Sequence, residues 1–141
     1  MTTYYNRVWK FGLQLPDGWS EPGGIARIFF FFRYAAQSSQ PEFYGPDRTS
    51  LKFAIGPISP EPSAEEQQQT LQHIAMKRGE QIIGVSTVQV GGRRHATMTV
   101  DMPYIGRVKH YSLIFRGIEY LVSARAPERV ADSIVASFRQ V

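Results

Sequence analysis

The sequence has 141 residues, a length typical of one domain, and 43% of them are hydrophobic, enough for a core of its own. The absence of cysteine excludes disulfide bonds and thiolate metal sites. The net charge of +4 comes from 16 basic residues scattered along the chain, unlike the dense Lys/Arg blocks of a dedicated nucleic-acid binder, so we expect one domain over residues 1–141 and no nucleic-acid partner.

The first part of the chain predicts two strands and a long loop. Apolar residues alternate with polar ones over Val8–Leu15, which predicts a strand with one covered face, and Pro16-Asp17-Gly18 ends it. The run Ile25–Ala35 is apolar on both parities, which predicts a strand in the middle of a sheet. Residues 36–50 are rich in Ser, Gly and Pro and predict a loop.

A third strand and a helix are predicted next. Leu51–Ile58 has the period of a strand. Ser63 followed by Glu66 predicts a reciprocal capping box at the start of a helix, and Gly79 is a typical residue to end it.

Two hairpins follow. Gly91-Gly92 is predicted to join Val85–Val90 to Arg93–Met102. Gly117-Ile118 is predicted to form a type II′ turn between Arg107–Arg116 and Glu119–Ala126. The register of that second hairpin places these pairs directly opposite each other: Arg116 and Glu119, Phe115 and Tyr120, Ile114 and Leu121, Leu113 and Val122.

The last element predicted is a core-facing helix from Pro127 to about Gln140, with Phe138 as its anchor. The fold class is therefore α+β, with the order β-β-β-α-β-β-β-β-α. We expect an αβα sandwich, in which helices flank a mostly antiparallel central sheet of about six to seven strands.

Short phrases at the two ends of the chain resemble the PsbP-like family, whose fold includes the Ran-binding protein Mog and bacterial secretion-adaptor chaperones. The phrases are the opening Phe11–Trp19, then Gly117–Val122 and the closing Ala136-Ser137-Phe138. The resemblance implies an αβα sandwich and a non-catalytic binding role. It transfers no binding site, because relatives use different faces for different partners.

No catalytic or metal-binding pattern accompanies these elements. His73, His95 and His110 have no metal-ligand spacing, and we expect them to be solvated or hydrogen-bonded. The sequence has no nucleophile elbow and no phosphate-binding loop, so we expect no catalytic residue, metal or cofactor, and an enzyme ranks third among the functions.

Aromatic and basic residues in predicted loops and turns are the candidates for partner binding. Phe43 and Tyr44 either anchor a partner or cover the core, and Trp19 is expected to cover the core. Arg93 and Arg94 belong to a basic hairpin end that Arg107 and Lys109 extend, for which a solvated end is the alternative. The partner-binding set is Phe43, Tyr44, Arg48, Arg93, Arg94 and Tyr104.

We therefore expect a non-catalytic, cytoplasmic protein-binding module: an adaptor, chaperone or accessory subunit. The alternative is a carrier of a small apolar ligand under the aromatic-rich sheet. The partner is another protein, and a homodimer remains open. No signal peptide opens the sequence, and the longest apolar run, Ile28–Phe32, is far too short to span a membrane.

Overall fold

The computed structural model describes residues 1–21 and 40–141. The predicted strand Ile25–Ala35 lies outside the described residues. The described elements, in chain order, are β1 (Thr2–Asn6), β2 (Phe11–Leu15), β3 (Glu42–Tyr44), β4 (Ser50–Pro57), α3 (Ala64–Lys77), β5 (Gln81–Val90), β6 (Arg93–Met102), β7 (Gly106–Phe115), β8 (Ile118–Arg125), α4 (Glu128–Ala136) and β9 (Arg139–Gln140).

A six-stranded antiparallel sheet forms the centre of the fold. Its strand order is β3-β4-β8-β7-β6-β5, and every neighbouring pair in it is antiparallel. The two edges differ in length, because β3 has three residues and β5 has ten. The predicted mostly antiparallel central sheet is confirmed.

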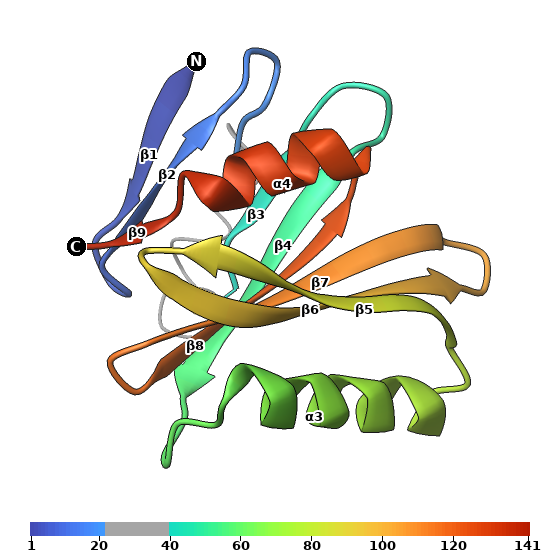
Figure 1. Ribbon diagram of the computed structural model, residues 1–141. Helices are drawn as coiled ribbons and strands as arrows, with labels where there is room; N and C mark the ends of the chain where they lie inside the picture. The colour runs from blue at the N-terminus through green and yellow to red at the C-terminus, as the bar shows by residue number, and fades with distance from the viewer. Residues whose placement is uncertain (22–39) are drawn as a thin grey trace.

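Helices cover both faces of this sheet, α3 on one side and α4 on the other (Figure 1). Two separate apolar clusters hold the helices to the sheet. Ala96, Met98 and Val100 belong to the apolar cluster that includes Leu71 and Ala75 of α3. A larger, aromatic-rich cluster on the other side includes Ala131, Ile134 and Val135 of α4. The αβα arrangement predicted from the sequence is confirmed.

The start of α3 forms as its sequence predicts. Ser63 Oγ accepts the N–H of Glu66, and the Glu66 carboxylate accepts the N–H of Ser63, both over 3.1 Å. The bond from the Ser63 backbone N–H, and then the Ser63 side chain, lower the pKa of the Glu66 carboxyl. Gly79, with φ of +68°, follows the helix end.

The predicted first strand is wrong at its start, because residues 7–10 form a turn between β1 and β2. The Asn6 side chain accepts the backbone N–H groups of Val8 and Trp9, and Lys10 has a left-handed φ of +53°. The strand β1 was missed by the sequence reasoning. Together with β2 and the terminal β9, it forms a second, three-stranded sheet.

The predicted register of the β7–β8 hairpin is also wrong. Phe115 lies opposite Ile118, so the turn is Arg116-Gly117 and not Gly117-Ile118. Both turn residues have positive φ, +50° and +76°, the geometry of a type I′ turn. Every predicted partner is thus displaced by two residues, which leaves each side chain on its predicted face but removes the predicted pair of Arg116 and Glu119.

The last helix ends earlier than predicted, at Ala136. Ser137 Oγ accepts the N–H of Gln14 on β2, and Arg139–Gln140 then pair with that strand. Phe138, between α4 and β9 in the sequence, is buried and stacks on Phe11. The C-terminal residues therefore join the small sheet because β2 offers backbone partners there.

Candidate functional site

The sequence-predicted binding residues do not form one surface. Phe43 is 0% exposed on β3, where its ring packs against those of Tyr4 and Phe53. The interpretation of Phe43 as a loop aromatic that waits for a partner is therefore wrong. It covers the core, and Trp19, also buried, does the same as predicted.

Tyr44 and Arg48 remain exposed near the β3–β4 turn. The Tyr44 hydroxyl donates to the Glu42 carboxylate, and this bond raises the pKa of the phenol. Arg48 follows Asp47, and both have left-handed φ, +61° and +56°. These side chains lie on the surface, but without the aromatic neighbour that the sequence suggested.

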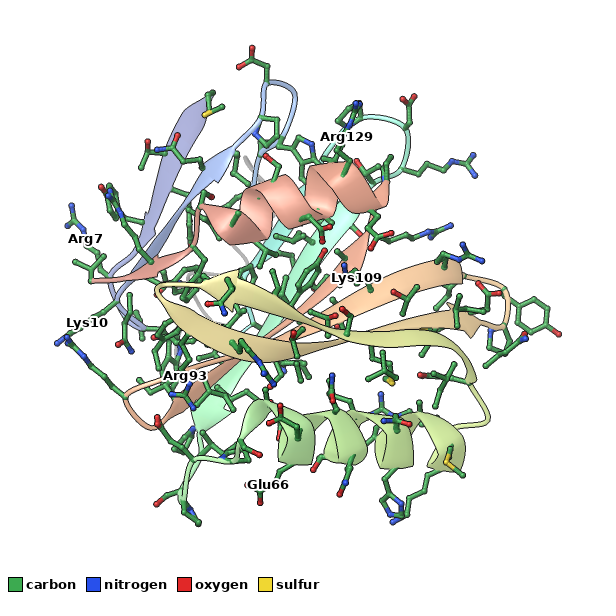
Figure 2. All side chains as sticks on the ribbon, viewed as in Figure 1. Arg7, Lys10, Glu66, Arg93, Lys109 and Arg129 are labelled. Carbon is green, nitrogen blue, oxygen red and sulfur yellow. The ribbon has the colours of Figure 1, made fainter. Side chains whose placement is uncertain are left out.

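The predicted basic hairpin end is neutralised by ion pairs. Arg93 lies 3.2 Å from the carboxylate of Glu61, and Arg94 pairs with Glu65 near the start of α3. Of the labelled basic side chains elsewhere, Arg7 and Lys10 lie near the turn between β1 and β2, and Arg129 lies apart from them on α4 (Figure 2). Both arginines of this hairpin end are therefore paired with carboxylates.

Lys109 is bound between two carboxylates under α4. Its ammonium group lies 2.9 Å from Glu128 and 2.9 Å from Asp132, and Asp132 also accepts the hydroxyl of Tyr111 over 2.5 Å. Burial alone would lower the pKa of Lys109, but the bonds to the two carboxylates raise it. Burial, and then Asp132, raise the pKa of Tyr111. The network attaches α4 to β7 and leaves Lys109 no role in a basic edge.

His95 is buried and fully engaged by the backbone. Its Nδ1 accepts the N–H of Ile114 over 3.1 Å, so its Nε2 carries the proton and donates to the carbonyl of Val90, also over 3.1 Å. Burial lowers the pKa of this imidazole, and the Arg93 charge lowers it further. His95 is therefore a neutral structural group, as the sequence favoured.

The other two histidines have equally simple environments. His110 Nδ1 lies 2.8 Å from Ser123 Oγ, its partner across the ladder, and burial lowers the pKa of its ring. The register predicted for this hairpin would place Arg125 opposite His110, and the observed register excludes that pair. His73 is exposed on α3. No group of three or more metal-ligating side chains occurs within residues 1–21 and 40–141.

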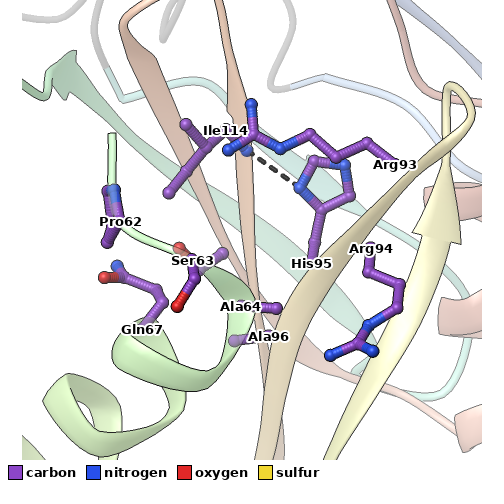
Figure 3. Close-up of a pocket in the computed structure, with 10 residues that line it drawn as sticks. Pro62, Ser63, Ala64, Gln67, Arg93, Arg94, His95, Ala96 and Ile114 are labelled. Carbon is purple, nitrogen blue, oxygen red and sulfur yellow. Dashed lines mark hydrogen bonds between the residues drawn. The ribbon is translucent and has the colours of Figure 1, made fainter. Parts of the chain in front are cut away.

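A small pocket lies beside His95, between the start of α3 and strands β6 and β7 (Figure 3). Its cavity volume is about 10 Å³, room for one water molecule. Polar side chains, among them Ser63, Gln67 and Ser112, line it. This pocket gives no support to a small apolar ligand.

Four exposed apolar residues belong to segments that meet at the opposite end of the β5–β6 hairpin, and we call these four residues the apolar end. It is defined by Met76 at the end of α3, Ile83 on β5, and Tyr104 and Ile105 at the β6–β7 turn. Figure 1 shows that these three segments end on the same side of the molecule. Sequence reasoning found only Tyr104 among these four.

Two backbone irregularities produce this exposure. The register of β5 on β6 shifts between Ile82 and Gly84, so Ile82 and Val85 both pack under α3 while Ile83 between them is exposed. Tyr104 has a left-handed φ of +65°, and its side chain is 107% exposed. A tyrosine in this conformation is strained, and such strain is concentrated at functional sites.

The sequence matches no family model, and it matches no curated protein. Within residues 1–21 and 40–141, neither helix is long and apolar enough to span a membrane.

Solved structures share the fold. The solution structure of cyanobacterial PsbP (CyanoP) from Synechocystis sp. PCC 6803 matches with a TM-score of 0.65 at 12% identity, covering 99% of this chain and 92% of that chain. The Saccharomyces cerevisiae Ran-binding protein Mog1p matches with a TM-score of 0.65 at 8% identity, covering 99% of this chain and 95% of that one. The PsbP-like and Mog-like fold predicted from the sequence is confirmed.

Proposed function

We propose that this chain is a non-catalytic protein-binding module of the cytoplasm, an adaptor, chaperone or accessory subunit, and that the apolar end contacts its partner. The fold is shared with the Ran-binding protein Mog1p, and that likeness favours a protein as the partner. The described residues offer no group of metal ligands, and both ring nitrogens of His95 are occupied by backbone bonds. These observations support binding over catalysis.

The observation that carries the proposal is Tyr104. Tyr104 is 107% exposed, so its ring does not pack in the core. Met76, at the same end, is 72% exposed. Apolar side chains that gather on a surface mark interaction sites, and tyrosine is enriched among the residues that dominate binding energy. We therefore propose that Tyr104 is the residue that anchors the partner to this chain.

Affinity capture with matched variants tests the proposal. The double variant Tyr104→Ser with Ile105→Ser removes two exposed apolar groups from the apolar end. The control Tyr5→Ser with Val8→Ser removes two exposed apolar groups near the β1–β2 turn. A partner captured by the wild type and the control, and lost from the first variant, supports the proposal. A partner lost equally from both, or from neither, contradicts it.

A further inference from the structure

Within residues 1–21 and 40–141, the central sheet has one edge with a covering segment, β3, and one edge without a further strand beside it, β5. At β3, the backbones of Ser20 and Tyr44 exchange two hydrogen bonds of 2.9 and 2.8 Å. The strand itself has three residues, with Pro41 just before it and Pro46 just after it. Short length, nearby prolines and a covering segment are the devices by which proteins block unwanted strand pairing.

The opposite edge, β5, has almost none of these devices. Its ten residues include no charged residue and no proline, and among the described residues its only ladder partner is β6. The bulge between Ile82 and Gly84 interrupts the first part of the strand, but the pairing from Gly84 to Val90 is regular. A long, uncharged edge of this kind is a template for another strand.

The hairpin geometry identifies the backbone groups that point away from β6, of which the Thr87 carbonyl accepts a long bond of 3.5 Å from the Ser86 hydroxyl. Gly91 and Gly92 have φ of +61° and +75°, a type I′ turn, in which the flanking residues Val90 and Arg93 face each other as a hydrogen-bonded pair. Because such pairs alternate along an antiparallel ladder, Val85, Thr87 and Gln89 direct their N–H and C=O groups away from β6.

The helix beside this edge is also uncharged where it meets the strand. Gln68 of α3 donates to the carbonyl of Ser86 over 2.9 Å, which places this side of the helix next to β5. One turn later, Gln72 bonds back to the Gln68 carbonyl, and Met76 follows in the same row. A strand added at β5 would therefore meet the amide and thioether groups of this row, and the nearby Arg94, opposite Gln89, is already paired with Glu65.

We propose that the β5 edge binds an extended, uncharged segment of the partner protein, rich in β-branched residues, which adds as a further strand to the sheet. The inference deepens the proposed function and rests on it. The two surfaces are continuous, because Ile83 of the apolar end belongs to β5 itself. The backbone groups of Val85, Thr87 and Gln89 would form the hydrogen bonds to the added strand. Because β5 carries no charged residue, the edge favours an uncharged segment.

A peptide titration tests the strand addition directly. The probe is a capped synthetic peptide of alternating Val and Thr residues, added to the isotope-labelled protein and followed by amide chemical shifts. We expect shifts centred on Val85, Thr87 and Gln89, and none with the same peptide N-methylated at alternate amides. The absence of shifts at millimolar peptide, or shifts confined to other strands, would overturn the proposal.

Variants of one position separate the backbone from the side chain. Thr87→Pro removes an N–H that points away from β6, and proline is tolerated at such edge positions of a sheet. The variant should therefore lose peptide binding because the N–H that would bond to the added strand is gone. Thr87→Val keeps that N–H and should bind as the wild type does. Equal binding by both variants, with wild-type circular dichroism, would contradict the proposal.

A second pair of variants keeps the test decisive if the proline variant fails to fold. Gln89→Lys places a charge on the regular part of the edge and should weaken peptide binding about tenfold. Gln81→Lys places the same charge before the bulge and should leave peptide binding unchanged. Tyr104→Ser with Ile105→Ser should bind the peptide normally, so failure of the apolar end and failure of the strand site are distinguishable. A dimer of the free protein that Gln89→Lys dissociates would assign the edge to a second copy and overturn the proposal.

Discussion

The N–H of Ile114 donates to Nδ1 of His95 over 3.1 Å, which makes this buried imidazole a neutral link between β6 and β7. The other ring nitrogen is bound to the carbonyl of Val90. Protonation would place a second hydrogen against the Ile114 amide and bring a charge close to Arg93. Both effects oppose the charged ring, in addition to burial.

The stability of the fold should therefore depend on pH through the buried His95 and the half-buried His110. The pKa of His95 and of His110 is lowered from 6.5 in the folded protein. Below that pH the unfolded chain takes up protons that the folded chain does not, so stability should be full above pH 6.5 and fall as the pH drops through the folded pKa values. Denaturant unfolding across this range measures the effect.

The variant His95→Gln assigns part of that dependence. A glutamine amide can accept from Ile114 and donate to Val90 but does not titrate in this range. We expect it to reduce the pH dependence, while His73→Gln, at an exposed position of α3, leaves it unchanged. An unaltered pH profile in the His95→Gln protein would refute the assignment.

Trp19 packs directly on Gly45, where only the absence of a side chain makes room. A Cβ at Gly45 would lie 2.3 Å from Cε2 of Trp19 and 2.5 Å from Oγ1 of Thr49. Gly45→Ala should therefore destabilise the protein by about 1–3 kcal/mol, the usual cost of an overpacked site. Gly56→Ala is the control, since a Cβ there meets nothing within 4 Å. Equal unfolding midpoints for the two variants would show that Trp19 is not fixed over Gly45.

Neighbouring aromatics on β3 should respond oppositely to truncation. Phe43→Ala removes a fully buried ring and should cost about 3–5 kcal/mol of stability. Tyr44→Ala removes an exposed ring and should leave the free energy of unfolding nearly unchanged. Thermal melts of the two single variants measure this difference. If Phe43→Ala were neutral, the core around Phe53 would not be packed as described.

Local signals in the sequence predicted the parts of the fold that depend on local chemistry. The Ser63–Glu66 capping box and the Gly91-Gly92 turn were found because each requires particular side chains at a fixed spacing. The β7–β8 register was not, because the left-handed φ belongs to Arg116, a residue that rarely adopts it. The early end of α4 depends on β2, which is far away in the sequence and invisible to helical periodicity.

The candidate site was harder to predict for a related reason. Surface exposure at Ile83 arises from a bulge, and no residue type marks a bulge there. Phe43 looked like a loop aromatic because only three residues of strand surround it, while its burial comes from Tyr4 and Phe53. Tyr104 was found because a turn aromatic after proline is conspicuous in the sequence itself.

Site-specific photocrosslinking tests the central claim, that the apolar end is the partner-binding surface, most directly. A benzoyl-phenylalanine in place of Tyr104 should crosslink in cells to one discrete protein. The same group in place of Tyr44 or Tyr5, both exposed tyrosines on other strands, serves as the control and should not crosslink to it. If the discrete product forms from Tyr44 or Tyr5 and not from Tyr104, the apolar end is not the binding surface.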